Sequence, residues 1–225
     1  MEINGVEIKA GADLQNANLF AANLSSSDLS EANLSNANLS KTNFSGSHLG
    51  HAILEFANLT EAILSEAILE EANLSRANLT EANLTGTNLH QAILYRANLT
   101  HAHLFRANLT EANLTEANLT RANLPSAKLK NANLTRANLT DASFVYTDFS
   151  HANLYEANLT GLQLEEYFFE ESTVSANFSH ANLYGANLTE ANLTGANFHG
   201  ANLTGANFHG ANLTGATMPD GTIHD

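Results

Sequence analysis

The sequence predicts an all-β fold in which the chain winds into a four-sided β-solenoid of about ten coils, each made of four five-residue units. Two observations carry this prediction. A large apolar residue, most often Leu, returns every five residues from Leu14 onward, and Ala stands two positions before it in most units. In addition, the motif Asn-Leu-Thr returns every 20 residues between Asn58 and Thr160.

The five-residue spacing decides between a helix, a flat strand and a winding chain. Leu residues five apart would spread around the whole circumference of a helix, and they would point to alternating faces of a flat strand. A chain that turns after each short extended side keeps all of them on one axis. Because the Asn-Leu-Thr motif recurs after every fourth unit, four sides make one turn. Asn, Ser, Thr and Gly fill many outward positions, and turns favour these residues.

A tandem A-N/D-L-x-x pattern, seen clearly in ANLTEANLTEANLTRANL at residues 107–124, resembles the pentapeptide-repeat family. The resemblance covers about residues 12–218. It implies a right-handed quadrilateral β-helix with Leu and Ala inward. For most of this family the biological role is undetermined, so the resemblance alone supplies no function.

The elements follow in order along the chain. Residues 1–11 lack the repeat, and we expect them to form an N-terminal cap over the first coil. Residues 12–160 form the first part of the β-helix, and residues 176–218 form the second part. Between them, residues 161–175 are an irregular break or loop. Residues 219–225 form a C-terminal tail, in which Pro-Asp-Gly predicts a turn.

The break is the clearest departure from the pattern. Leu162 and Tyr167 fall at positions where Ala is expected, and both look too large for that slot. From Leu164 to Phe178 the spacing is one residue short of three units, so either a coil lacks one residue or a loop of four, nine or fourteen residues leaves the wall. We expect this stretch to protrude and to contact a partner through acidic and aromatic side chains. The candidate contact residues are Glu165, Glu166, Tyr167, Phe168, Phe169, Glu170 and Glu171.

Charged residues at the corners of the solenoid fall into vertical columns. One column holds Arg76, Arg96, Glu116, Arg136 and Glu156, and opposite charges often follow one another in it. We expect surface ladders of ion pairs, because like charges stacked about 5 Å apart would repel. Paired carboxylates that act in catalysis need a cleft, which a straight rod does not supply.

Isoleucine replaces the outward Asn at four positions. Ile53 and Ile93 lie on one side two coils apart, whereas Ile63 and Ile68 occupy two other sides. Scattered apolar surface residues are normal, so we expect no single patch from these four.

Composition narrows the classes of function. The chain contains no Cys, and its histidines do not converge as a zinc site requires, so the sequence predicts no metal, no cofactor and no catalytic residues. The formal charge of −14 disfavours direct binding to nucleic acid or to an anionic membrane. We find no signal peptide and no apolar membrane span, so we expect a cytoplasmic protein.

Several functions remain open at this stage. We expect a non-enzymatic interaction protein, monomeric, that presents a rigid acidic surface to a protein partner. The alternative is a DNA mimic that binds DNA gyrase or a related topoisomerase, because some members of the resembled family are acidic rods of this kind. Ice binding by the single rank of Thr from Thr60 to Thr160 is a third hypothesis.

Overall fold

The computed structural model describes residues 2–3, 6–162 and 176–225. It begins with a short antiparallel hairpin of β1 (Glu2–Ile3) and β2 (Val6–Glu7). Ile8, directly after this hairpin, is buried and belongs to the hydrophobic core. The assignment of residues 1–11 as a cap stays a prediction.

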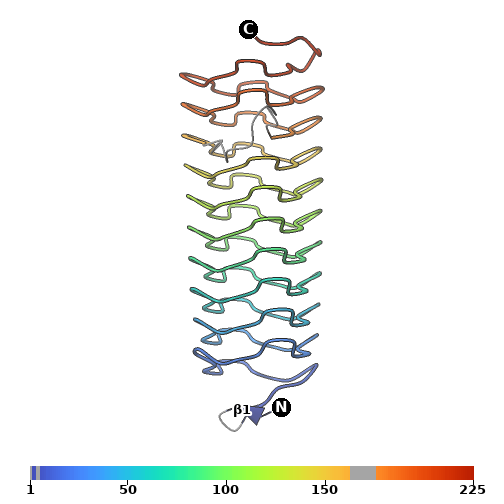
Figure 1. Ribbon diagram of the computed structural model, residues 1–225, viewed down its shortest axis with the longest axis vertical. Coiled ribbons are helices and arrows are strands. Elements are labelled where there is room, and N and C mark those ends of the chain that lie inside the picture. The colour runs from blue at the N-terminus through green and yellow to red at the C-terminus, as the bar shows by residue number, and fades with distance from the viewer. Residues whose placement is uncertain (1, 4–5, 163–175) are drawn as a thin grey trace, which may run out of the picture.

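After the hairpin the chain winds as a stack of coils, each lying on the one before (Figure 1). Parallel bridges join residues 20 positions apart, as in the run from Asn58 through Asn78 and Asn98 to Asn118. With five residues per side, this separation confirms four sides per turn. Within the described residues β1 and β2 are the only strands longer than one residue, because each side is too short to form more than one bridge. The number of coils stays a prediction.

Backbone hydrogen bonds tie each coil to the next. The Leu119 N–H donates to the Asn138 carbonyl in the next coil at 2.6 Å, and the Asn138 N–H donates back to the Ala117 carbonyl at 2.9 Å. The large apolar residue of each five-residue unit, which we call its centre, therefore points its N–H toward the C-terminal end of the rod. The outward residue before it, most often Asn, points its N–H toward the N-terminal end.

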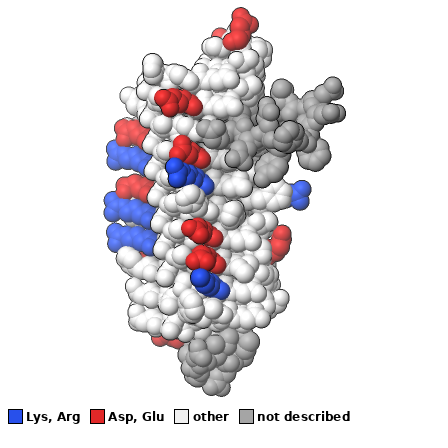
Figure 2. All heavy atoms as spheres, turned by 60° about the vertical axis from the view of Figure 1, so that its left-hand side comes forward, with Lys and Arg blue, Asp and Glu red and all other residues white. Residues whose placement is uncertain are grey.

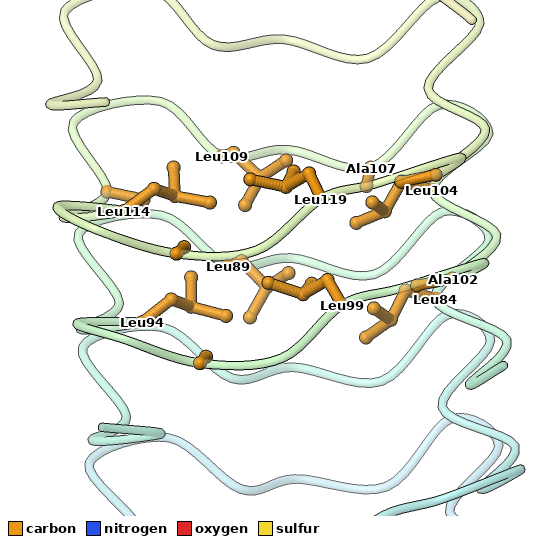
Figure 3. Packing of buried hydrophobic residues seen from close by; sticks show 14 of the residues in the cluster. Leu84, Leu89, Leu94, Leu99, Ala102, Leu104, Ala107, Leu109, Leu114 and Leu119 are labelled. Carbon is orange, nitrogen blue, oxygen red and sulfur yellow. The ribbon is translucent and has the colours of Figure 1, made fainter. Parts of the chain in front are cut away.

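The core is a stack of Leu and Ala side chains inside the coil (Figure 3). The sequence predicts that the centres and the slots, which are the Ala positions two residues before them, point inward. The structure agrees, with full burial of the centres Leu99 and Leu119 and of the slot residues Ala102 and Ala107. Each buried Leu contributes about 1.5–3 kcal/mol relative to an exposed one. Each coil packs only against its neighbours, so stability is distributed along the rod.

Threonine can replace Ala in the inward slot without leaving a buried polar group unpaired. Thr42, Thr87 and Thr147 are buried, and each hydroxyl donates to the carbonyl of a Leu in the preceding coil at 2.7–2.8 Å.

The described corner residues, each of which stands just before an inward slot, have a left-handed backbone conformation. Arg76, Glu81 and Glu116 have φ angles of 57°, 59° and 57°. Such angles are unfavourable for residues other than Gly, and Asn is tolerated better than most. The corners nevertheless carry many Glu, Arg and His residues, so the turn preference of Asn, Ser, Thr and Gly does not by itself locate this position. Hydrogen bonds to the next coil hold the strained turn, as where the Glu116 N–H donates to the Thr135 carbonyl at 2.9 Å.

The register across the break is set by the described residues on either side. Asn158 bridges to Asn187, 29 positions on, in place of 20. The chain therefore holds nine residues more than the wall requires between Leu162 and Ala176, which is one of the three loop lengths that the sequence allows.

The expectation that Leu162 cannot occupy an Ala slot is wrong. Its side chain is fully buried, and its carbonyl accepts the Asn192 N–H at 3.0 Å, as a slot residue does. The slots before and after it in the same column hold Ala142 and Ala191, whose small side chains leave room for a larger one. The wall thus continues through Leu162, whereas Tyr167 lies outside the described residues.

The C-terminal tail pairs with one side of the last coil. Thr217 and Ile223 form an antiparallel bridge, and Gly221, with φ of 86°, donates its N–H to the Met218 carbonyl at 2.9 Å. Leu203 and Leu213, on other sides of this coil, are only partly buried. The described part of the chain contains no helix that is long and apolar enough to span a membrane.

Candidate interaction surface

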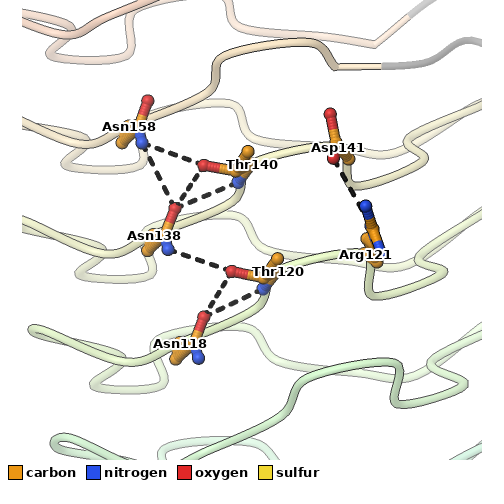
Figure 4. A network of polar contacts seen from close by, with 7 residues as sticks. All are labelled: Asn118, Thr120, Arg121, Asn138, Thr140, Asp141 and Asn158. Carbon is orange, nitrogen blue, oxygen red and sulfur yellow. Dashed lines mark hydrogen bonds and ion pairs between the residues drawn. The ribbon is translucent and has the colours of Figure 1, made fainter.

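One side of the rod carries a continuous ladder of Asn and Thr (Figure 4). Thr120 donates its hydroxyl to the Asn118 side-chain oxygen at 2.6 Å, and its backbone N–H donates to the same oxygen at 3.1 Å. The amide nitrogen of Asn138, one coil later, donates to the Thr120 hydroxyl at 2.9 Å. Because each hydroxyl is already engaged in this way, the ladder fixes the wall and offers little to ice or to a ligand.

Columns of charge border this ladder on both sides (Figure 2). Arg96 and Glu116 approach to 2.6 Å and Arg136 and Glu156 to 2.7 Å, both pairs joining adjacent coils of one column. In the second column Lys41–Glu61 and Arg121–Asp141 are each 3.4 Å apart. The predicted ion-pair ladders are confirmed at these positions. These groups are exposed, apart from the half-buried Glu116, so each pair adds little stability by itself.

Two tyrosines lie beside the C-terminal end of the first column, each one residue before a corner position. The rings of Tyr155 and Tyr184 stack with centroids 5.4 Å apart. The Arg136 guanidinium and the Tyr155 hydroxyl lower the pKa of the Glu156 carboxyl by hydrogen bonding to it. Conversely, the hydrogen bond to this carboxylate raises the pKa of Tyr155.

A group of arginine, aromatic and aliphatic side chains lies at the N-terminal end of the same column and on the side that leads into it, and all of them are exposed except the half-buried Tyr95. The Arg76 guanidinium lies 5.3 Å from the centre of the Phe56 ring, and that of Arg96 lies 5.1 Å from the Tyr95 ring. We call this group the arginine–aromatic patch. It consists of Ile53, Phe56, Arg76, Ile93, Tyr95 and Arg96.

Sequence reasoning missed this patch because it considered the isoleucines separately from the charged column. Ile53 and Ile93 belong to one bridge ladder, with Asn73 between them, on the side that runs directly into the corner column. The signal was present in the sequence, since Phe56 follows Ile53 by three residues and Tyr95-Arg96 follow Ile93.

The candidate contact residues of the break are not among those that the structure describes. Residues 163–175, which include all seven residues from Glu165 to Glu171, lie outside the described ranges. The structure brings their flanks Leu162 and Ala176 into the wall. The assignment of these seven residues as a contact site therefore stays a prediction. Over the described residues no group of three or more His, Asp or Glu side chains is placed to hold a metal ion.

The comparison with protein families identifies the repeat. The model of pentapeptide repeats matches in eight copies, over residues 12–50, 52–166 and 181–218. The chain belongs to the pentapeptide-repeat family. The right-handed quadrilateral β-helix is the fold of this family, and pentapeptide-repeat proteins are generally non-enzymatic.

Among solved structures, the chain is similar to HetL of the cyanobacterium Nostoc sp. strain PCC 7120, a pentapeptide-repeat protein involved in heterocyst differentiation regulation. The two share 38% identity over 98% of this chain and 94% of HetL, with a TM-score of 0.81. A likeness to QnrB1, a plasmid-mediated fluoroquinolone resistance protein, has 19% identity over 92% of this chain and 89% of that one, with a TM-score of 0.44. A search among curated proteins found no match.

Proposed function

We propose that this pentapeptide-repeat protein is a non-enzymatic interaction protein that presents rigid β-helical faces to a protein partner in a regulatory complex. The observation that carries the proposal is the full-length similarity to HetL, which is itself involved in regulation. A wall that is hydrogen-bonded from coil to coil supports it, because a rigid surface loses little conformational freedom on binding.

We further propose that the segment from Glu165 to Glu171 makes part of the contact. Its sequence supports this assignment, because aromatic side chains are enriched at interfaces and the four carboxylates favour a basic partner surface. The nine additional residues between Leu162 and Ala176 also support it, since the wall does not require them.

The register suggests a deletion that tests the contact without disturbing the repeat. Removing the nine residues 165–173 joins Leu164 to Val174. Leu164 then stands five residues after Leu159 as a centre, and Ala176 stands five residues after Leu162 as a slot. We expect this variant to fold with denaturant unfolding close to that of the full chain. A matched variant that lacks only residues 165–172 is one residue out of register, and we expect it to be less stable.

The functional measurement is affinity capture from the source organism, with identification by mass spectrometry. We expect a protein captured by the full chain to be lost with the nine-residue deletion. Capture of the same protein by both chains would show that the contact lies elsewhere on the rod. Failure of the full chain to capture any protein specifically would contradict the interaction function itself.

The alternative, a DNA-mimic binder of DNA gyrase or a related topoisomerase, draws support from the formal charge of −14. Ion pairing opposes it, because Arg96, Arg121 and Arg136 interrupt the acidic columns. A DNA supercoiling assay with bacterial gyrase decides the matter. Inhibition at low micromolar protein would favour mimicry, and no effect would remove this alternative.

A further inference from the structure

The arginine–aromatic patch replaces groups that stabilise the wall elsewhere. Where Asn occupies the outward position of the same side, as at Asn113, its side-chain oxygen accepts hydrogen bonds from Thr115 at 2.7 and 3.1 Å. Isoleucine at positions 53 and 93 cannot make these bonds. Ile53 and Ile93 are instead 41% and 40% exposed, and Phe56 is 46% exposed. The patch therefore exposes apolar surface where the repeat ordinarily places a bonded amide.

The patch also holds a cation that no carboxylate of the described residues neutralises. Arg96 pairs with Glu116, but Arg76 forms no ion pair there and rests on the Phe56 ring. In its column Arg76 lies between Phe56 and Arg96, so neither vertical neighbour supplies a carboxylate. Its guanidinium is exposed and keeps several N–H donors available for a carboxylate.

We propose that the arginine–aromatic patch docks a protein partner whose contact surface combines apolar side chains with a carboxylate that meets Arg76. Arg, Tyr and Phe are enriched at the centres of protein interfaces, where surrounding contacts exclude water and strengthen a charge pair. The charge of Arg76 selects a carboxylate, and the exposed faces of Ile53, Phe56 and Ile93 select apolar neighbours. This inference rests on the proposed interaction function and states the chemistry of the partner.

The test uses a phage-displayed library of short random peptides, selected on the full chain. We expect the enriched peptides to contain Asp or Glu together with aromatic or aliphatic residues. Binding of one such peptide, measured by fluorescence polarisation, should weaken by about tenfold or more with Arg76→Glu and with Ile93→Asp. Glu already occupies other corners with positive φ, so Arg76→Glu should fold normally.

The chain supplies a matched control at another corner. Arg106 also rests on an exposed aromatic ring, with its guanidinium 4.9 Å from the centre of Phe105, and it forms no ion pair within the described residues. Arg106→Glu makes the same change in net charge and removes the same kind of contact. We expect it to leave peptide binding within about twofold of the unchanged chain.

Four results would overturn the proposal. In the selection, these are a failure to enrich any peptide and an enrichment of peptides that lack Asp and Glu. In the binding measurement, they are equal affinity of the peptide for Arg76→Glu and the unchanged chain, and a loss of affinity with Arg106→Glu as large as that with Arg76→Glu. Arg76-dependent binding of a fluorescent single-stranded oligonucleotide would instead assign the patch to nucleic acid. Peptides that bind elsewhere on the rod would remove the docking site but leave the interaction function standing.

Discussion

Single residues in this rod have roles that the repeat pattern indicates only in part. The pattern identifies Leu119 as inward and Thr120 as outward, and both assignments are confirmed. It does not show that Thr120 joins two coils, because the three hydrogen bonds around its hydroxyl and N–H depend on side-chain rotamers and on the vertical register. From its residue type and outward position alone, Thr120 would be taken for a replaceable surface residue.

The first prediction separates the two roles. Leu119→Ala should lower the free energy of unfolding by about 2–5 kcal/mol, because it leaves a cavity in the core. Thr120→Ala should lower it by about 1 kcal/mol, because two side-chain hydrogen bonds are lost and the Asn118 and Asn138 amides lose a partner. Denaturant unfolding measures both. Thr120→Ser keeps the hydroxyl and is the control. Equal losses for the Leu119 and Thr120 variants would contradict the inward assignment of the centres.

The second prediction concerns the pKa of Glu156. The hydrogen bond from Arg136 is the main cause of its lowered pKa, with the Tyr155 hydroxyl next. Arg136→Gln should therefore raise the pKa of Glu156 toward its ordinary value, which an NMR titration of the side-chain carboxyl can follow. Because the pKa is lower in the folded state, the pair stabilises the fold above the unfolded pKa. This contribution disappears as the pH falls through the folded value. An unchanged pKa would show that the Tyr155 hydroxyl, and not Arg136, controls it.

At the scale of elements, the sequence predicts the sides better than the corners. The position of each side can be predicted from the five-residue spacing of Leu and Ala, because these residues must be buried in every unit. The corner conformation cannot be predicted from residue type, because Glu, Arg and His occupy a position that intrinsic preference assigns to Gly or Asn. Tertiary hydrogen bonds to the next coil override the local preference there. The same limit applies to Leu162, whose fit depends on its neighbours in the stack.

The third prediction tests the corner at Glu81, which has φ of 59° and no ion pair in the described part of the chain. Glu81→Val should be less stable than Glu81→Gly by about 1–2 kcal/mol, because a β-branched residue tolerates the left-handed region poorly. Thermal or denaturant unfolding of the two variants gives the difference.

The control for this comparison is Glu70, whose backbone lies outside the left-handed region. There, Glu70→Val should be at least as stable as Glu70→Gly, because Gly loses more backbone freedom on folding and no positive φ penalises Val. Equal stability of Glu81→Val and Glu81→Gly would mean that the corner relaxes.

At the scale of the whole molecule, the two ends of the rod differ. Leu14 and Leu24 in the first coil are buried as fully as the centres of the middle coils, whereas Leu203 and Leu213 in the last coil are only partly buried. The two ends are alike in backbone pairing, because the N–H groups of Leu203 and Leu213 at one end, and those of Asn18 and Asn23 at the other, have no acceptor among the described residues. The asymmetry therefore lies in the burial of the large apolar residues. The sequence predicts the stack itself, but this asymmetry depends on how far the tail reaches.

The last prediction follows from this asymmetry. In a solenoid each coil is stabilised only by its neighbours, so opening should begin at the end that has fewer contacts and proceed inward. Amide hydrogen exchange should therefore be fastest at Leu203 and Leu213, slower at Leu183, whose N–H donates to Asn202 at 2.9 Å, and slowest near Leu119. Leu24, close to the other end but fully buried, should be better protected than Leu203. Exchange followed by NMR or mass spectrometry resolves this gradient. Uniform protection along the rod would show that it opens as one unit, and faster exchange at Leu24 than at Leu203 would place the weak end at the N-terminus.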